Sequence, residues 1–202
     1  MPRLVNHQQR RAQLAEIAAL MIARDGLEKT TIRSIAQESG YSKGIIEHYF
    51  DNKDDLIASA LEWLNQRYAE RVQRHIGQRT GLAALRIRLE QTLPLSTASR
   101  QEWSVRLRFW SLAAVDPQFQ VEQSQRWQAA RQAFIQDLKQ AQEQGEVSAD
   151  LDPVKATDHL LYLTSGVSVT TLHSPDSLTR NQLRQHLEEW LAQLPRACTA
   201  QH

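Results

Sequence analysis

The stretch Thr30–Lys53, TTIRSIAQESGYSKGIIEHYFDNK, decides the fold of the N-terminal part of the chain. Its first half has the i, i+3, i+4 spacing of an amphipathic helix, at Ile32, Ile35 and Ala36. Thr31 is a suitable N-cap for that helix, and Gly40 suits the left-handed residue that ends it. Ser42 can cap a second helix almost at once. Two short helices joined by so tight a turn predict a helix-turn-helix.

The second helix of this stretch has an apolar inner face and a mixed outer face. Ile46 and Phe50 lie four residues apart, so we expect both to pack inward. Gly44 costs about 1 kcal/mol of helix propensity relative to alanine, and it allows the backbone to approach a flat surface closely. A helix N-terminus with Lys43 beside this glycine suits a phosphate backbone or the edge of a groove. The stretch therefore predicts a DNA-binding helix.

Composition bounds this prediction without deciding it. The 202 residues are enough for one or two domains, and they carry 24 Lys+Arg against 23 Asp+Glu. Residues 1–53 hold eight basic and six acidic side chains, which leaves 16 basic and 17 acidic ones, or +2 against −1. The sign of this difference favours nucleic acid binding by the first part, but the motif carries the prediction.

Cysteine usage and the termini indicate a cytoplasmic protein. The one cysteine, Cys198, has no partner within the chain, which fits a reducing compartment. The basic start MPRLVNHQQRR is followed by no clean apolar run, so we expect no signal peptide. No stretch approaches 18 uncharged apolar residues, so we expect no membrane partner.

The rest of the chain is predicted to be helical, with no strand. One helix is expected from His7 to Arg24, and a long one, capped by Asp51 or Asn52, runs to about Ile76. Gly77 and Gly81 bracket a loop, and the Ser/Thr-rich segment 96–99 is expected to be a break. Further helices are expected over residues 82–93, around 103–112, and over 118–144, 153–173 and 179–194. This gives nine helices in an all-α fold.

The N-terminal fifty-odd residues resemble the TetR family of bacterial transcriptional regulators. Many positions match in order: Arg24–Gly26, Thr30–Ile32, Ile35–Ala36, Gly40–Gly44, His48–Phe50, Asn52–Lys53 and Leu56. The motif Gly44–Phe50, together with Arg108–Trp110 ahead of Asp116–Pro117, looks most like the BetI-type branch, the repressors of choline-to-betaine genes.

The resemblance implies a domain organisation and a set of partners. Residues 1–53 would form a three-helix helix-turn-helix domain, linked by the long helix 52–76 to a ligand-binding and dimerisation domain of about six helices, residues 54–195. Residues 196–202 would be a flexible tail. The protein would bind a palindromic operator in double-stranded DNA as a homodimer. A small-molecule effector would release it, and no cofactor or metal is implied.

The same resemblance implies which residues contact DNA. The positions are Thr31, Arg33, Tyr41, Ser42, Lys43, Gly44, Ile45, Glu47, His48, Tyr49 and Lys53. Glu47 departs from the pattern, because it puts an acid where a groove-facing side chain is expected. It can accept a hydrogen bond from a cytosine amino group, or it can pair with Lys43 at i−4. Both alternatives remain open.

Large aromatic residues mark a candidate effector pocket. Aromatic faces attract quaternary ammonium groups, but such residues at helical spacing are also typical of an ordinary core. The residues concerned are Trp63, Trp103, Leu107, Trp110, Trp127, Tyr162 and Gly166. No aromatic comes directly after Gly166, where we would expect one in the betaine branch, and this speaks against choline as the effector.

The last two predicted helices carry a candidate dimer interface. Its residues are Leu163, Val167, Val169, Leu183, Leu187, Trp190 and Leu191. In the family the equivalent two helices form a four-helix interface with the same two helices of a second copy. The alternative is a hairpin packed within one chain.

The sequence shows no features of an enzyme. It has no nucleophile with a nearby base and no Gly-rich phosphate loop, and His159, His173 and His186 lack metal-ligand spacing. The alternatives to a repressor are an activator, a nucleoid-associated protein without a ligand, and a helical ligand-carrier or interaction protein.

Overall fold

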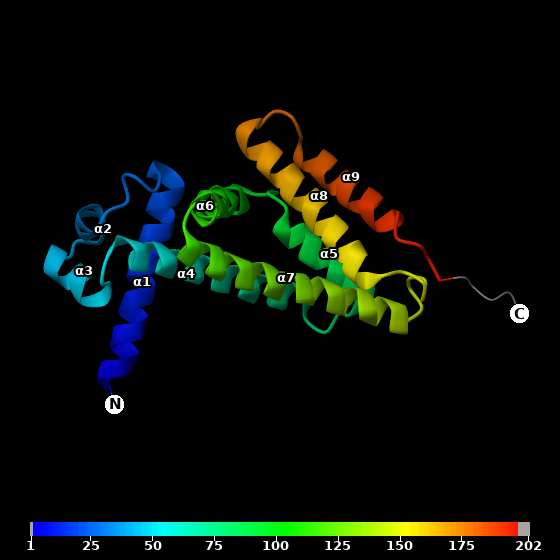
Figure 1. The fold of residues 1–202 in the computed structure, drawn as a ribbon, viewed down its shortest axis with the longest axis horizontal. Helices are drawn as coiled ribbons and strands as arrows, with labels where there is room; N and C mark the ends of the chain where they lie inside the picture. The colour runs from blue at the N-terminus through cyan, green and yellow to red at the C-terminus, as the bar shows by residue number, and fades with distance from the viewer. Residues whose placement is uncertain (1, 198–202) are drawn as a thin grey trace, which may run out of the picture. The chain divides into compact units, whose positions relative to one another are not determined.

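A computed structural model describes residues 2–197, with side chains from residue 7 on. Within these residues the chain forms nine helices and no strand, which confirms the all-α prediction (Figure 1). The helices are α1 (Pro2–Asp25), α2 (Ile32–Ser39), α3 (Lys43–Tyr49), α4 (Lys53–Ile76), α5 (Gly81–Thr92), α6 (Thr97–Ala113), α7 (Pro117–Glu143), α8 (Pro153–His173) and α9 (Arg180–Ala192). Cys198 and the predicted tail beyond residue 197 lie outside the described residues.

The predicted helix caps are confirmed by their hydrogen bonds. Ser42 Oγ accepts from the Ile45 backbone N–H at 3.3 Å at the start of α3. Asn52 Oδ1 accepts from the Asp55 N–H at 2.9 Å, so Asn52 rather than Asp51 caps α4. Asp152 caps α8 by accepting from two backbone N–H groups, and Thr179 forms a capping box with Gln182 at the start of α9.

Two predicted boundaries were wrong, and the cap of α5 was not predicted. The first helix begins at Pro2 rather than His7. The segment 96–99 starts a helix instead of breaking one, because Ser96 and Ser99 cap each other's backbone N–H groups. Gly81 begins α5 with a φ of +60°, and Glu146, 64 residues further along, accepts from the Leu82 N–H at 2.7 Å. A cap that comes from so far along the chain has no local sequence signal.

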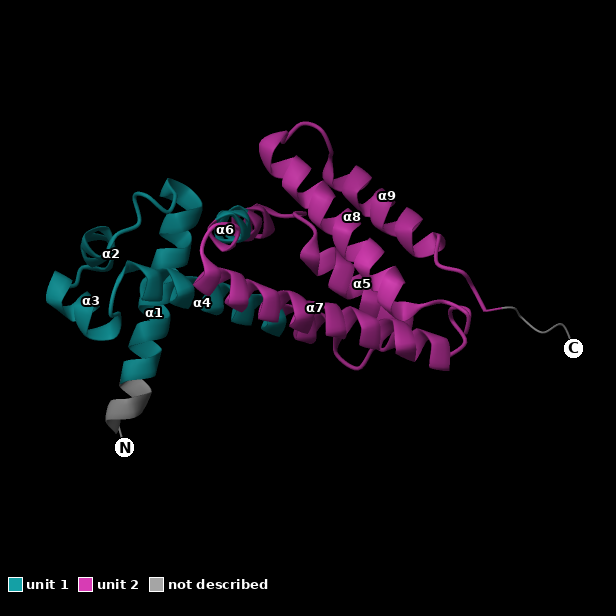
Figure 2. Ribbon diagram, viewed as in Figure 1, with its two compact units in different colours: residues 1–70, 104–111 teal, residues 71–103, 112–202 magenta. Residues whose placement is uncertain are grey.

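The chain divides into two compact units, which Figure 2 shows in different colours. Unit 1 comprises residues 1–70 and 104–111, and unit 2 comprises residues 71–103 and 112–202. Unit 1 therefore contains α1 to α3, most of α4 and the second half of α6. None of the helices in residues 2–197 has the length and apolarity that crossing a membrane requires.

Unit 1 is built around a small apolar core. Leu14, Ala18 and Ile22 give α1 one buried face, since they repeat every four residues. The other three helices add side chains that are 0 or 1% exposed. These are Ile35 from α2, Ile46 and Phe50 from α3 and its C-cap, and Leu56 from α4. The prediction that Ile46 and Phe50 pack inward is confirmed. Burial of one such side chain contributes about 1.5–3 kcal/mol, so these two residues attach α3 to the core.

Unit 2 has a larger core between α5, α7, α8 and α9. Its buried members include Leu85, Leu89, Leu93, Phe134, Leu138, Leu160, Leu161 and Leu187. An ion pair is buried beside it: Arg88 on α5 donates to Asp137 on α7 at 2.6 Å, and Asp137 is 4% exposed. Burial raises the pKa of Asp137 above its ordinary value of 3.8, and Arg88 opposes that rise.

Candidate nucleic-acid interface

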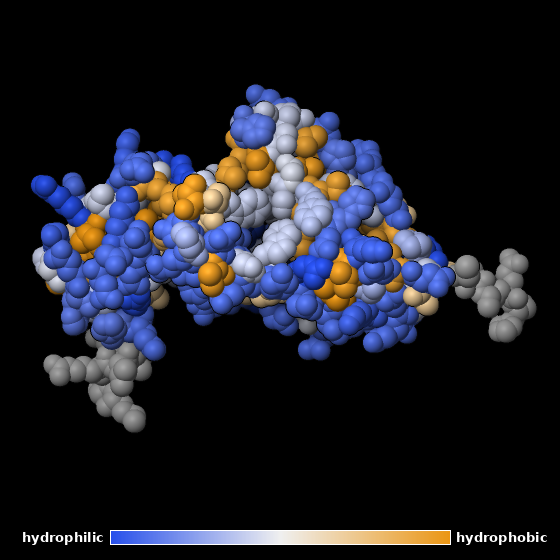
Figure 3. Space-filling model, in the orientation of Figure 1, coloured by the Kyte–Doolittle hydropathy of each residue, from blue (hydrophilic) through white to orange (hydrophobic). Residues whose placement is uncertain are grey.

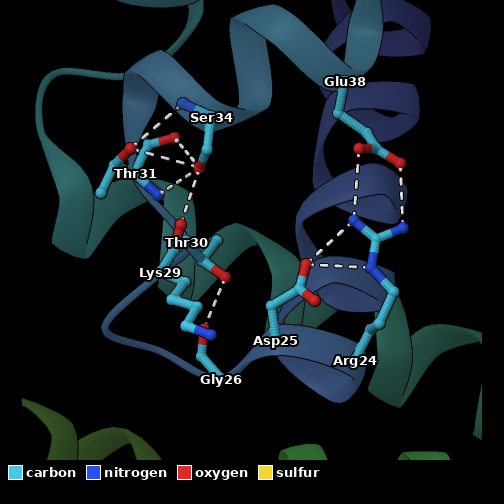
Figure 4. A network of polar contacts seen from close by, with 8 residues as sticks. All are labelled: Arg24, Asp25, Gly26, Lys29, Thr30, Thr31, Ser34 and Glu38. Carbon is cyan, nitrogen blue, oxygen red and sulfur yellow. Dashed lines mark hydrogen bonds and ion pairs between the residues drawn. The ribbon is translucent and has the colours of Figure 1, made fainter.

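α2 and α3 are joined by the predicted tight turn. Gly40 has a φ of +73° and ends α2, with its N–H donating to the Ala36 carbonyl. At the other end of α2, Thr31 and Ser34 exchange hydrogen bonds in a capping box, drawn in Figure 4. Thr31 is therefore occupied as a cap and half-buried, whereas Arg33 is exposed.

A salt bridge fixes α2 against the end of α1. The two terminal nitrogens of Arg24 donate to the two carboxylate oxygens of Glu38 at 3.1 and 3.2 Å, and Arg24 also donates to Asp25 (Figure 4). Hydrogen bonds from Arg24 lower the pKa of Glu38 and of Asp25 below their ordinary values. The pair is exposed, so it orients α2 more than it stabilises the fold.

One face of α3 is left free by the packing of Ile46. Lys43, Gly44, Ile45, Glu47 and His48 are all exposed. Ile45 is 41% exposed, and a Cβ on Gly44 would meet no atom within 4 Å. A narrow helix with a bare backbone at its N-terminus, an exposed isoleucine and a lysine has the form and chemistry to enter a DNA groove.

Glu47 pairs with Lys43 in the structure. Lys43 Nζ lies 2.8 Å from Glu47 Oε1, so the ion pair forms in the free protein, and the contact of Glu47 with a cytosine amino group stays a prediction. Both side chains remain about half exposed or more, at 64% and 49%. The pair thus lies on the free face of α3 and is open to solvent.

The N-terminal part of α1 reaches the same face through His7, a residue that the sequence did not indicate. The His7 ring lies 5.6 Å from that of His48 and 4.7 Å from that of Tyr49, between centroids. His48 and Tyr49 are also in edge-to-face contact at 5.2 Å. These three rings form one aromatic cluster beside the free face. No periodicity could have shown it, because it depends on how α1 crosses α3.

Two further arginines of α1, which the sequence did not indicate, contact the helix-turn-helix. Arg10 donates to the hydroxyl of Tyr41 in the turn, and its guanidinium lies 5.1 Å from the centre of the Tyr41 ring. Arg11 donates to the Tyr49 carbonyl at the end of α3 and to Asp55 and Ser59 of α4. Lys53 is half-buried at the start of α4.

The seven residues predicted for an effector pocket do not share one environment. Trp103 is 2% exposed and its Nε1 donates to the Thr92 carbonyl at 2.6 Å, as in an ordinary core. Trp63, Leu107, Trp110 and Trp127 are half-buried. Gly166 is exposed, and Tyr162, 64% exposed, stacks on Trp127 with 6.4 Å between ring centroids. Trp127 and Tyr162 in unit 2 thus offer adjacent aromatic faces that are at least partly accessible.

The predicted dimer residues divide between core and surface. Leu183, Leu187, Trp190 and Leu191 of α9 are at most 8% exposed within a single chain. These four side chains are thus buried without a second copy, and their part in a dimer interface stays a prediction. On α8, Leu163, Val167 and Val169 are half-buried. Figure 3 shows intermediate and hydrophobic residues on the surface along α8.

Comparison with known families covers most of the chain. Residues 14–60 match the family described as bacterial regulatory proteins, tetR family. Residues 82–196 match the one described as BetI-type transcriptional repressor, C-terminal. Arg10 and Arg11 precede the first match.

Two regulators illustrate the sequence similarity. The chain is 33% identical over 119 residues to the HTH-type transcriptional regulator BetI of Paraburkholderia phymatum, a match that covers 58% of this chain and 61% of that protein. It is 36% identical over 73 residues to the HTH-type transcriptional regulator PksA of Bacillus subtilis, 36% of either chain. These matches thus span between about a third and three-fifths of the relatives' lengths.

Solved structures show the same fold along nearly the whole chain. A transcriptional regulator from Saccharomonospora viridis in complex with choline superposes with a TM-score of 0.81 at 25% identity, covering 92% of this chain and 97% of that one. A transcriptional regulator from Pseudomonas aeruginosa gives a TM-score of 0.75 at 26% identity, covering 92% and 89%.

Proposed function

Because the chain belongs to the TetR family of bacterial regulators, with a BetI-type C-terminal region, we propose that it is a DNA-binding transcriptional repressor. It acts in the cytoplasm, on the nucleoid. The observation that carries the proposal is the free face of α3, on which Lys43, Ile45, Glu47 and His48 are exposed while Ile46 anchors the helix. The domain boundaries at residues 53 and 54 expected from the family remain part of this proposal.

The recognition helix, α3, enters the major groove in this proposal. Ser42, Gly44 and Lys43 lie at its N-terminus, where free backbone N–H groups and positive charge suit phosphates. Ile45 and His48 then face base edges, with Arg33, Tyr49 and Lys53 at the flanks. Apolar side chains can contact the methyl group of thymine, and we assign this role to the exposed Ile45.

The repressor acts as a homodimer on a palindromic operator. A two-fold axis between copies requires two half-sites related by the same symmetry, about 34–36 Å apart or somewhat more. Since the four α9 residues are buried within one chain, we place the contact between copies on the exposed side of α8, at Gly166 and the half-buried Val169.

A small molecule that binds the C-terminal domain releases the DNA. The effector favours a conformation in which α4 pivots, and the two recognition helices then no longer match the half-site spacing. The regulator from S. viridis binds choline in its crystal structure, which makes choline the first compound to test. The faces of Trp127 and Tyr162 can attract a quaternary ammonium group, but the chain has no aromatic directly after Gly166 to complete a cage.

The experiment that tests the proposal is retention of DNA fragments from the source genome by the purified protein at fixed, moderate salt, followed by sequencing. One enriched palindrome near a few promoters supports a sequence-specific regulator. Uniform retention that disappears with added salt shows electrostatic binding alone. That result would overturn the proposal in favour of a nucleoid-associated protein, and no retention at low salt would favour a helical carrier or interaction protein.

A further inference from the structure

α3 is too short to hold its own orientation. It has seven residues, Lys43–Tyr49, and Ile46 is its only buried residue, with Phe50 buried at its C-cap. Isolated helices of about two turns are marginal in water, and one inward residue does not prevent a helix from rolling about its axis. Other contacts must therefore set the angle at which the free face of α3 meets DNA.

Arg10 of α1 holds the chain just before α3 begins. Its Nη1 donates to the Tyr41 hydroxyl and to Gln13 Oε1, the latter at 3.3 Å. Its guanidinium carbon lies 5.1 Å from the centre of the Tyr41 ring, a cation–π contact. Tyr41 is half of the two-residue turn that ends at Ser42, so Arg10 fixes the entry to α3.

Arg11, the next residue of α1, holds the other end of α3. Its Nη1 donates to the backbone carbonyl of Tyr49, the last residue of the helix. Carbonyls in the last turn lack partners within a helix and form the negative end of its dipole, so a cation is well placed there. The guanidinium carbon also lies 4.7 Å from the centre of the Phe50 ring.

From these contacts we propose that Arg10 and Arg11 are positioning residues that brace the recognition helix at both ends, with Arg11 also linking it to α4. The second terminal nitrogen of Arg11 donates to Ser59 Oγ at 2.8 Å and to Asp55, which in turn accepts from the Asp51 N–H at 3.1 Å. One planar guanidinium thus joins α1, the end of α3 and the first two turns of α4. A movement of α4 reaches the recognition helix through this side chain.

Lysine cannot replace Arg11 in this arrangement. An ammonium group can pair with Asp55, but it has no planar fork to reach the Tyr49 carbonyl and Ser59 together, nor a flat face to lie over Phe50. Arg11→Lys keeps the charge of the unit, so long-range attraction to DNA is preserved. This separates a positioning role from a direct phosphate contact.

The inference rests on the proposed DNA binding, and its test uses the full-length protein with two duplexes. One duplex carries the palindrome that the wild-type protein selects, and the other carries the same bases in scrambled order. Arg11→Lys is expected to lower affinity for the palindrome about tenfold or more, since hydrogen bonds to a charged group are lost. Affinity for the scrambled duplex and the salt slope should stay within error of wild type. Arg180→Lys, at an exposed position of α9, is the matched control.

Three results would overturn the brace. Equal palindrome affinity in wild type and Arg11→Lys shows that Arg11 positions nothing. A parallel fall on both duplexes, together with a smaller salt slope, makes Arg11 a phosphate contact. A parallel fall with an unchanged slope and a lower melting temperature makes it merely structural. A wild-type protein that selects no palindrome would instead overturn the proposed function itself.

A milder variant keeps the test decisive if Arg11→Lys does not fold. Ser59→Ala removes one acceptor of Arg11 on α4 and leaves the Tyr49 and Asp55 contacts in place. We expect palindrome affinity to fall about threefold, with scrambled-duplex affinity unchanged. Faster amide hydrogen exchange confined to residues 43–50 should accompany it. Unchanged affinity and exchange in this variant also overturn the inference.

Discussion

Lys43 Nζ lies 2.8 Å from Glu47 Oε1, one turn along the recognition helix, and both groups are open to solvent. The free protein therefore keeps the cation at the N-terminus of α3 in an internal ion pair. Exposed pairs of this kind contribute only about 0–1 kcal/mol, so DNA phosphates can replace Glu47 at small cost. In the proposed complex Glu47 would turn away from Lys43 as a phosphate takes its place.

Replacement of Lys43 tests whether that exchange takes place. Lys43→Ala should weaken binding and reduce the slope of log K against log salt by about 0.9, the change for one phosphate contact. Fluorescence anisotropy over a range of salt concentrations measures both quantities. Lys139→Ala, which removes the same charge from an exposed position on α7, should leave the slope unchanged. An unchanged slope in Lys43→Ala would remove this residue from the phosphate contacts.

Glu47→Gln should act in the opposite direction. The variant releases Lys43 and removes a negative charge from the DNA-facing surface, so affinity for non-specific duplexes should rise about two- to fivefold at low salt. Binding to a scrambled duplex measures this directly. If instead the variant loses base preference at one position of each half-site, Glu47 accepts from a cytosine amino group in the complex.

The Arg24–Glu38 pair makes the attachment of α2 sensitive to acid. Arg24 holds the pKa of Glu38 below its ordinary value of 4.5, so pairing adds stability above that pH and is lost as pH falls through the lower folded-state value. Between pH 5 and pH 3 the wild type should therefore lose more stability than Glu38→Gln, which cannot titrate there. Urea unfolding at a series of pH values tests this. Parallel pH profiles for the two proteins would falsify the expectation.

The buried pair in unit 2 should be far more costly to break. Arg88→Ala leaves Asp137, 4% exposed, without its cation, and such a change destabilises by about 3–5 kcal/mol. Denaturant unfolding gives the difference. Replacing both residues by apolar ones, as in Arg88→Met with Asp137→Leu, should recover most of the loss, because no buried charge remains. A double variant as unstable as the single one would mean that the pair specifies the packing of α5 on α7.

Local signals account for most of what the sequence predicted correctly. Thr31, Ser42, Asp152 and Thr179 cap helices through residues within three positions, and Gly40 adopts the left-handed conformation that a helix end requires. The inward packing of Ile46 follows from spacing alone. These features are written into short windows of sequence, so they are visible before any tertiary contact is known.

What the sequence missed depends on contacts between distant residues. His7 lies beside His48, Arg11 beside Tyr49, and Glu146 caps α5 across 64 residues. The part of the α9 leucines in a dimer face stays a prediction for the same reason, since one apolar stripe can be covered by the same chain or by a second copy. Helical periodicity shows that a face is buried, but not what buries it.

Gly166 tests where a second copy binds. It lies on the exposed side of α8 without a positive φ, and an added Cβ would meet no atom within 4 Å. In a single chain Gly166→Ala should therefore stabilise α8 by about 1 kcal/mol through helix propensity. If two copies pack through this glycine, the added methyl group overpacks the contact, and the dissociation constant of the dimer should rise about fivefold or more. Sedimentation equilibrium and thermal unfolding distinguish the two effects. A dimer as tight as wild type, in a more stable chain, would move the interface away from this face of α8.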